Sequence, residues 1–398
     1  MERPRRQIRA AISINAGDKP EAVRIISGIL ESATEKINIR MLGNLPPEVA
    51  RQRNAVSWGV IIGVLVLFLW VLRIVLKAFT PKHTDRTLGR RRNESWKAYL
   101  LASPALLLIA MWMYWPMARG TAIAFQDYSV IGQSEWIGAG NFSAVLFSGE
   151  FWYSVWVTVL YALMFMVFGF CAPIVLAFLL SEVPRGKLLF RTVFYLPAVL
   201  TGLVVIIMWK GFYAPDGMIN DLLNGVVRLV NLLPGVEMGL FREDWLQNPN
   251  WALFFCLLPT VWAGMGPGCL IYLAALKTIP EEIYEAADID GAGIRHKVTH
   301  VAIPTIKVLV MINFIGAMIG AIRGSGGFIL AMTGGGPYSG LGGATEVVGL
   351  KLFFTTFGYL KFGVGAAMAW VIGAMLIGFT VLQLKRLSNV EFRTAGGA

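Results

Sequence analysis

Seven long apolar segments run through this 398-residue chain, separated by shorter stretches that hold most of its charge. A helix needs about 20 apolar residues to cross a bilayer, and each segment reaches that length. The chain is 56% hydrophobic, more than one soluble core can bury, so lipid must be its solvent. The sequence therefore predicts an all-α integral membrane protein. The expected spans are residues 56–76, 98–118, 152–180, 188–209, 251–276, 301–322 and 360–384.

Lysine and arginine gather at the ends of the apolar segments, a pattern that orients spans in a membrane. The net charge of +11 therefore indicates membrane orientation and not nucleic-acid binding. Residues 127–150 contain no lysine or arginine, whereas the next loop holds Arg185 and Lys187. Continuing the alternation places residues 277–300 and the C-terminus, beside Lys385, on the cytoplasmic side.

The first span has basic stretches on both flanks, which the positive-inside rule cannot satisfy together. Residues 1–54 carry ten lysines or arginines, and residues 77–97 carry seven. We place the 77–97 loop in the cytoplasm, because this choice orients all later spans consistently. No apolar stretch follows the early arginines, so a cleaved signal peptide is not expected. The expected organisation is an unplaced basic segment 1–54, an extra span with its loop 55–97, a core 98–387 and a cytoplasmic tail 388–398.

A charged, amphipathic stretch at residues 281–304 lies between two spans. A proline and two carboxylates are typical of a helix start, and small apolar residues at i, i+3 and i+4 form one face. These residues are Pro280, Glu281, Glu282, Ile283, Ala286 and Ala287. Gly291 and Gly293 can adopt positive φ without steric cost, so a sharp turn and a second short helix are expected after the first. Pro304 marks where the next span begins.

Side chains that usually carry catalysis or bind metals form no pattern in this chain. Cys171, Cys256 and Cys269 lie in apolar segments without CxxC spacing, so we expect neither a disulfide nor a metal site. His296 and His300 lack the glutamate of a zinc-protease motif. The chain has no GxxxxGK[ST] loop to hold nucleotide phosphates. We therefore expect no catalytic residue, no metal and no cofactor on this chain.

The expected spans hold almost no ionisable side chains, and Arg191 and Lys307 lie near cytoplasmic ends. Carriers driven by proton or sodium gradients generally need such groups near the midplane. Their scarcity favours a neutral or hydroxyl-rich solute and an energy source outside the lipid. Two alternatives stay open: an ion-coupled secondary carrier and a non-transporting membrane scaffold.

The spacing within residues 281–304 resembles the EAA loop in permease subunits of bacterial ABC importers. The matching residues are Glu285-Ala286-Ala287, then Gly291 after three residues, then Val301-Ala302-Ile303-Pro304 after nine more. In that family the loop is a cytoplasmic coupling helix that sits in a groove of the ATP-hydrolysing subunit. The resemblance implies coupling roles for Glu281, Glu282, Glu285, Ala286, Ala287, Asp290 and Gly291.

The resemblance extends over about residues 97–387. Pro104, Pro116 and Thr158 match the first half of sugar-type permeases, and the segment 331–337 is similar to their TGGGP segment. The match is to the first-permease type of the maltose and glycerol-3-phosphate systems. It implies a six-helix permease core, with one extra N-terminal transmembrane helix in this chain.

The resemblance also implies a function: a path for a sugar or related polyol across the bacterial cytoplasmic (inner) membrane. The implied partners are a second permease in a hetero-pair, two ABC ATPase subunits that use ATP and Mg, an extracytoplasmic solute-binding protein and membrane lipid, with no nucleic acid. The implied substrate path is Thr260, Trp262, Gly264, Ile322, Arg323 and Ser325. The implied periplasmic gate or binding-protein contact is Thr333, Gly334, Gly335, Gly336 and Pro337. Members of the family usually carry bulky or amide residues at the positions of 323–327, so whether Arg323 selects an anionic solute is left open.

Overall fold

Helices make up most of the chain in the computed structural model, which describes residue 27 and residues 46–79, 95–182, 187–233 and 235–388. The chain divides into two compact units, Met1–Gly63 and Val64–Ala398. The helix α3 (Pro47–Phe79) runs across their boundary. The expectations for most of segment 1–54, for most of the loop at 77–97 and for nearly all of the tail at 388–398 lie outside the described residues.

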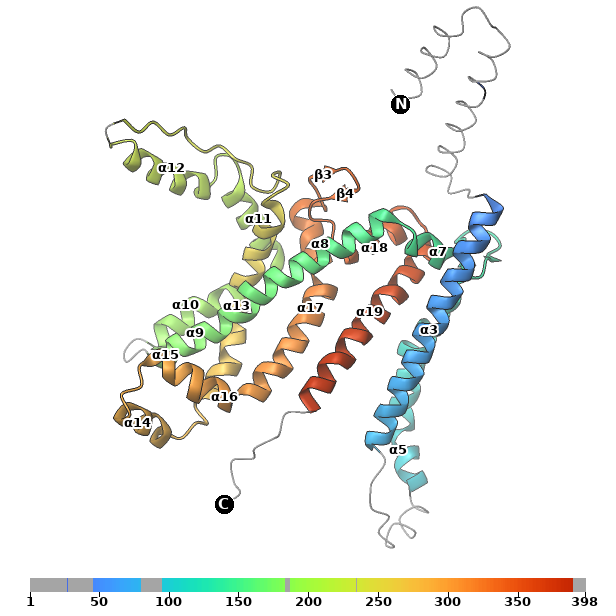
Figure 1. Ribbon diagram of the computed structural model, residues 1–398, viewed down its shortest axis with the longest axis horizontal. Coiled ribbons are helices and arrows are strands. Elements are labelled where there is room, and N and C mark those ends of the chain that lie inside the picture. The colour runs from blue at the N-terminus through green and yellow to red at the C-terminus, as the bar shows by residue number, and fades with distance from the viewer. Residues whose placement is uncertain (1–26, 28–45, 80–94, 183–186, 234, 389–398) are drawn as a thin grey trace, which may run out of the picture. The chain divides into compact units, whose positions relative to one another are not determined.

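Six helices among the described residues are long and apolar enough to cross a membrane, and one bent pair adds a seventh. This confirms the all-α, multi-span fold (Figure 1). Before the central helix, the elements are α5 (Ser95–Ile109), η2 (Ala110–Tyr114), α6 (Trp115–Ile123), α7 (Gly140–Leu146), α8 (Gly149–Phe165), η3 (Met166–Phe170), α9 (Cys171–Glu182), α10 (Lys187–Val199), α11 (Gly202–Tyr213) and α12 (Met218–Val230). From there they are α13 (Ala252–Leu276), α14 (Glu281–Ile289), α15 (Ile294–His296), η4 (Lys297–Ala302), α16 (Ile303–Thr305), α17 (Lys307–Thr333), α18 (Val348–Phe353), η5 (Phe354–Gly358) and α19 (Phe362–Ser388).

Two short antiparallel hairpins connect helices. In the first, β1 (Gln126–Asp127) pairs with β2 (Glu135–Trp136), and Gln126 lies opposite Trp136. In the second, β3 (Tyr338–Ser339) pairs with β4 (Gly342–Gly343), and Tyr338 lies opposite Gly343. The second hairpin begins directly after Pro337, the last residue of the expected TGGGP segment.

Three helical segments contain a wide, π-helical turn that ends two or three residues before a proline. The turn η2 precedes Pro116, η3 precedes Pro173 and η4 precedes Pro304. A proline has no N–H to donate, and its ring clashes with the carbonyl four residues back. Widening the preceding turn relieves this crowding while the chain stays helical. Each of these helical segments therefore continues past its proline.

In two places a span differs from the expected bounds at a charged residue. The prediction ended one span at residue 322, whereas α17 continues to Thr333. Arginine is a good helix former and each following glycine costs only about 1 kcal/mol, so the drop in hydropathy at Arg323 does not end the helix. The expected span 188–209 covers α10 and α11, which an extended Thr201 separates, whereas the helical stretch in this region that is long and apolar enough to cross a membrane is Gly202–Val230. Lys210, expected beyond that span, lies inside α11.

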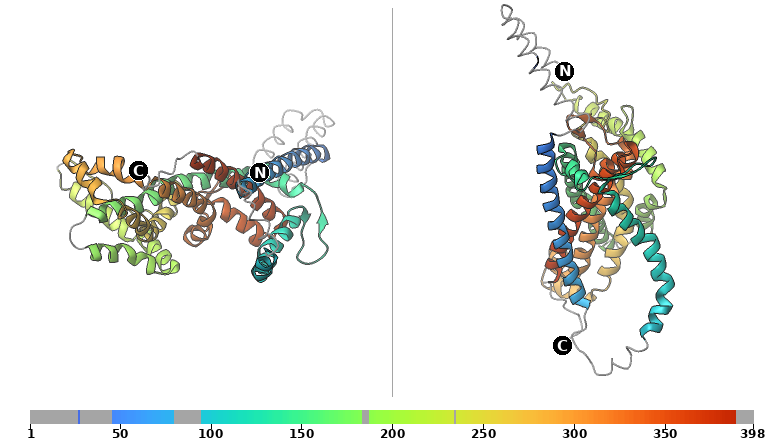
Figure 2. Two further views of the ribbon diagram at one scale, coloured as in Figure 1. Left: turned by 90° about the horizontal axis from the view of Figure 1, so that it is seen from below. Right: turned by 90° about the vertical axis from the view of Figure 1, so that its right-hand side faces the viewer.

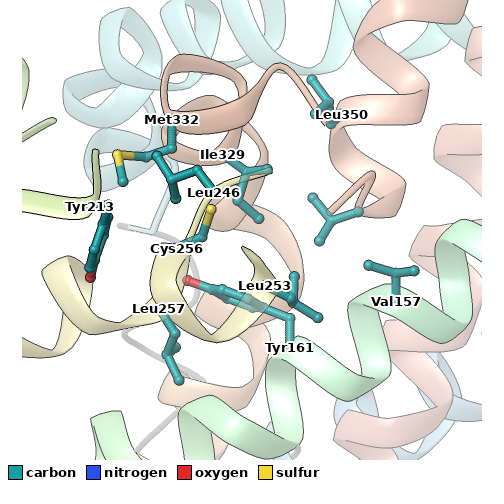
Figure 3. Packing of buried hydrophobic residues seen from close by; sticks show 11 residues of the cluster. Val157, Tyr161, Tyr213, Leu246, Leu253, Cys256, Leu257, Ile329, Met332 and Leu350 are labelled. Carbon is teal, nitrogen blue, oxygen red and sulfur yellow. The ribbon is translucent and has the colours of Figure 1, made fainter. Parts of the chain in front are cut away.

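The long helix α13 is central to the packing of the second unit, because each half contributes to a separate buried cluster. Its first half packs with α8, α11 and α17, and its second half with α9 and α10. The first cluster (Figure 3) consists of Val157, Tyr161, Tyr213, Leu246, Leu253, Cys256, Leu257, Ile329, Met332, Val347 and Leu350. The second cluster consists of Leu176, Ala177, Leu180, Cys269, Tyr272, Leu273, Leu276, Ile279, Ala302 and Ile306.

Three asparagines on α12 and just after it hold the segment that returns toward α13. The Asn224 amide accepts from the Phe241 N–H at 2.7 Å and donates to the Phe241 carbonyl at 2.9 Å. Asn231 makes the same reciprocal pair with Met238, at 2.8 and 2.9 Å. Asn220, 1% exposed, donates to the Glu243 carbonyl at 2.8 Å. Side-chain amides thus supply the hydrogen bonds that a neighbouring strand would otherwise give.

Candidate functional site

The helix α14, expected to couple to a partner, has no buried residue. It lies at one edge of the helices of its unit in Figure 1 and in the left view of Figure 2. The expected contact residues Glu281, Glu282, Glu285, Ala286, Asp290 and Gly291 are exposed, and Ala287 is half-buried. Ile283, on the small apolar face, is 44% exposed. The part of the chain that the structure describes therefore leaves this face open.

The turn after α14 is built around one glycine. Gly291 adopts φ +74°, as expected, whereas Gly293 has φ −67°, so the positive φ expected there is wrong. The Ala292 N–H donates to the Ala287 carbonyl at 2.9 Å, and the Gly291 N–H donates to the Asp288 carbonyl at 3.0 Å. This pair of bonds is the Schellman arrangement, which closes a helix when the residue after the C-cap is left-handed.

Asp288 and Tyr284 attach α14 to the rest of its unit. The Asp288 carboxylate pairs with the Lys297 ammonium at 2.5 Å. Tyr284 packs against the second cluster and borders an apolar cavity of about 310 Å³ beside α9. The helical segment that follows bends by 78° into α17. The next span thus begins at Lys307, three residues after the expected Pro304.

The TGGGP segment folds into a loop that two threonine hydroxyls close. Gly334 ends α17 in the left-handed conformation at φ +64°, and Gly335 follows at φ +93°. The fully buried Thr345 hydroxyl donates to the Gly336 carbonyl at 2.7 Å and lies 2.6 Å from the Thr333 hydroxyl. The threonines therefore hold the two ends of the loop together.

This loop presents different residues from those expected at a partner contact. Gly335 and Gly336 are buried and Pro337 is half-buried, so these three build the turn. Tyr338 and Leu341, on the hairpin just beyond them, are 62% and 60% exposed. Sequence reasoning missed both; a hairpin with glycines at its tip was the available signal.

A lysine between two carboxylates ties this loop to two helices. The Lys351 ammonium lies 2.7 Å from Glu150 at the start of α8 and 3.7 Å from Glu346 before α18. Burial would lower the pKa of Lys351, but its hydrogen bond with Glu150 and the charge of Glu346 raise that pKa above its usual value. The Thr158 hydroxyl of α8 also accepts from the Val348 N–H at 2.7 Å. Sequence reasoning missed this network.

A polar cavity of about 530 Å³ adjoins the lysine network. It is lined by Glu150, Tyr338, Glu346, Lys351, Tyr359 and their neighbours. Burial, followed by the charge of Glu346, raises the pKa of Tyr338. Its hydroxyl therefore stays protonated and donates to the Gly334 carbonyl at 2.6 Å.

The expected path residues on α13 have different surroundings. The Thr260 hydroxyl donates to the Leu257 carbonyl of its own helix at 2.6 Å. The half-buried Trp262 ring packs edge-on against Trp209, with centroids 5.9 Å apart. Gly264 is exposed, and a side chain there would meet no atom within 4 Å. Gly264 alone of the three faces open space.

The expected path residues on α17 point in three directions. Ile322 lines an apolar pocket of about 280 Å³ between α8 and α19. Ser325 is 5% exposed, with no hydrogen-bond partner for its hydroxyl among the described residues. Arg323 is exposed. Of these three residues on α17, only Arg323 is exposed, whereas Ile322 is half-buried and Ser325 is buried.

Groups that could bind a metal are scattered. Within the described ranges, no three histidine, cysteine, aspartate or glutamate side chains converge. The His296 and His300 rings stack with centroids 4.7 Å apart, and Thr299 contacts His300 at 2.8 Å. Cys171, Cys256 and Cys269 are free thiols.

Comparisons with known proteins agree with this arrangement. Residues 169–389 match the family described as binding-protein-dependent transport system inner membrane component. The probable ABC transporter permease protein YesP of Bacillus subtilis (strain 168) is 30% identical over 302 residues, covering 75% of this chain and 92% of YesP. The sulfoquinovosyl glycerol transport system permease protein SmoG of Agrobacterium fabrum (strain C58 / ATCC 33970) is 30% identical over 72% of this chain and 89% of SmoG.

Among solved structures, the fold resembles one chain of a bacterial ABC transporter involved in the import of the acidic polysaccharide alginate. The TM-score is 0.64 at 20% sequence identity, covering 77% of this chain and 99% of that chain. At this identity the likeness establishes a shared fold.

Proposed function

The chain belongs to the family of binding-protein-dependent transport system inner membrane components, and we propose that it forms the path for a carbohydrate or related polyol in an ATP-driven importer. It is a multi-pass inner-membrane protein and a transport subunit rather than an enzyme. Relatives named for glycoside and sugar transport, such as SmoG, support the carbohydrate class. The single observation that carries the proposal is the exposed, acidic α14 between two spans.

In this proposal α14 couples the spans to an ATP-hydrolysing partner. Its apolar face, with Ile283 and Ala286, is the kind of short helix face that fits a groove on another protein. Glu285 would contact the rim of that groove, and Gly291 would hold the turn. The Asp288–Lys297 pair joins α14 to the segment that bends into α17. A displacement of α14 would therefore reach α17 directly.

The proposed assembly contains a second permease, two ATPase subunits and an extracytoplasmic solute-binding protein. One solved transporter of this fold is a complex with an alginate pentasaccharide-bound periplasmic protein. By analogy, the exposed hairpin residues Tyr338 and Leu341 are the proposed contact for such a protein here. ATP and Mg would be used by the ATPase subunits, whereas Gly264 and Arg323 would border the solute path.

Co-purification and uptake together test the proposal. Glu285→Lys reverses an exposed charge on α14, and Asp221→Lys makes the same change on the exposed surface of α12. We expect the first variant to lose the ATPase subunits and ATP-dependent uptake in proteoliposomes, and the second to retain both. Uptake that persists without ATPase subunits and stops when ion gradients are dissipated would instead establish a secondary carrier. Absence of uptake from an assembled, ATP-hydrolysing complex offered saccharides would favour a scaffold.

A further inference from the structure

Arg323 lies deep within a span. It stands ten residues before the end of α17 and sixteen after its start, or about 15 Å and 24 Å along the axis at 1.5 Å per residue. A hydrocarbon core about 30 Å thick therefore encloses its Cα atom. Helical side chains lean toward the helix N-terminus, so this side chain points away from the nearer end of α17. It is poorly placed to extend its charge into interfacial water.

The guanidinium lies on a face of α17 that the described chain leaves open. After Lys307, the exposed positions recur every three to five residues along this helix: Ile312, Gly316, Gly320, Arg323, Gly327 and Ala331. This spacing keeps them on one narrow stripe. A side chain at Gly320 or Gly327, one turn to either side of Arg323, would meet no atom within 4 Å. Arg323 therefore has free space around it.

A second cation extends the positive charge along the same stripe. The Lys210 ammonium of α11 donates to the Ala331 carbonyl at 3.2 Å. Neither Lys210 nor Arg323 has an ion-pair partner in the portion of the chain that the structure describes. The helices α11, α13, α17 and α19 contain no aspartate or glutamate. The helix α8, which also packs on α17, has one carboxylate, Glu150, and that carboxylate pairs with Lys351. The stripe thus carries positive charge without a counter-charge from α11, α13 or α19.

An unpaired arginine facing lipid is costly, so such residues face water-filled paths or charged partners. A carboxylate on the second permease could neutralise Arg323, but a single helix-to-helix ion pair would not account for Lys210 about 12 Å further along the stripe. Arg323 and Lys210 lie one after the other along the direction in which a solute would cross the membrane. Two cations placed in this way suit an anion that moves from one to the other. The planar guanidinium also binds carboxylate, sulfonate and phosphate oxygens in pairs.

We propose that the solute is an acidic saccharide, whose carboxylate, sulfonate or phosphate group binds Arg323 during its passage. This inference rests on the proposed import function. It revises the expectation of a neutral solute, which followed from ending the spans at residues 209 and 322 and so leaving Lys210 and Arg323 outside them. The hydroxyl-rich character of the solute is retained.

Uptake by the complete complex, with its binding protein, in proteoliposomes tests the inference. The probes are labelled digalacturonate, glucose 6-sulfonate and glucose 6-phosphate, with cellobiose as the neutral comparison. We expect ATP-dependent uptake of at least one acidic probe and none of cellobiose. Arg323→Gln should lower the uptake of that probe at least tenfold, and Arg323→Lys should restore part of it. Arg228→Gln, an exposed arginine on α12, is the matched control and should be neutral.

Three results would overturn the inference, and they separate it from the import function. Uptake of cellobiose alone, unchanged by Arg323→Gln, would leave import standing and remove the acidic solute. Loss of the second permease on purification of Arg323→Gln would make Arg323 an interface residue. Absence of ATP-dependent uptake of every probe by the assembled wild-type complex would contradict both proposals together.

Discussion

Replacing Lys351 with methionine should destabilise the chain mainly because the buried Glu346 carboxylate loses its ion-pair partner. The lysine side chain is 13% exposed and that of Glu346 is 8% exposed, with 3.7 Å between their charged atoms. At an effective dielectric of 20, this pair attracts by about 4.5 kcal/mol before desolvation is subtracted. Removing one partner of a buried pair typically costs about 3 to 5 kcal/mol, and we expect the lower end here. The pair with Glu150 adds less, because that carboxylate is 60% exposed.

A double-mutant cycle isolates this effect. In the Glu346→Gln variant, the uncharged amide oxygen at position 346 can still accept from the Gly343 N–H and leaves no buried charge. The cost of adding Lys351→Met to this variant should therefore fall to about 1 kcal/mol. The expected coupling between positions 346 and 351 is therefore about 2 kcal/mol. Denaturant titration of the purified permease in bicelles measures each free energy of unfolding, with Glu150→Gln as the control at under about 1 kcal/mol. A Lys351→Met cost that is the same with Glu or Gln at position 346 would refute the reasoning.

Four further predictions follow from the geometry. Gly291→Ala strains a left-handed turn by about 1 to 2 kcal/mol and should reduce ATP-dependent uptake up to about tenfold, whereas Gly293→Ala at φ −67° should not. Thr158→Val removes the buried acceptor of the Val348 N–H and should lower the free energy of unfolding by about 1 to 3 kcal/mol; an unchanged denaturation midpoint would contradict this. Asn224→Ala should speed hydrogen exchange at the Phe241 amide, measured by mass spectrometry, at least several-fold. Because the pKa of Lys351 is raised in the folded chain, its stabilisation is complete below the usual value of 10.5 and is lost as pH rises through the raised value. The stability difference between wild type and Lys351→Met should thus be flat from about pH 7 to 9 and shrink above about 10.5.

Hydropathy and charge spacing were enough to predict the number of spans and the exposed helix between two of them. Both signals are local, since the pattern of a span or an amphipathic helix is complete within about 20 residues. The ends of spans were less well predicted, because a lone charge lowers hydropathy without lowering helix propensity. Arg323 and Lys210 were therefore expected beyond their helices and lie within them.

The lysine network could not be predicted, because its partners are far apart in the sequence. Lys351 and Glu150 are separated by 201 residues, and Val348 and Thr158 by 190. No periodicity or motif relates such positions; only the packing of α18 on α8 brings them together. The wide turns η2, η3 and η4 are an intermediate case, since a proline follows each of them within three residues and could have predicted it, whereas η5 has no proline nearby.

The asparagines that hold the segment after α12 form these hydrogen bonds with its main chain and not with its side chains. Met238 and Phe241 contribute only their main-chain atoms to these bonds, and both side chains are exposed. The identity of those side chains can therefore drift while the path of the chain stays fixed. Such a surface can change to suit a new partner without any change in the helix that supports it.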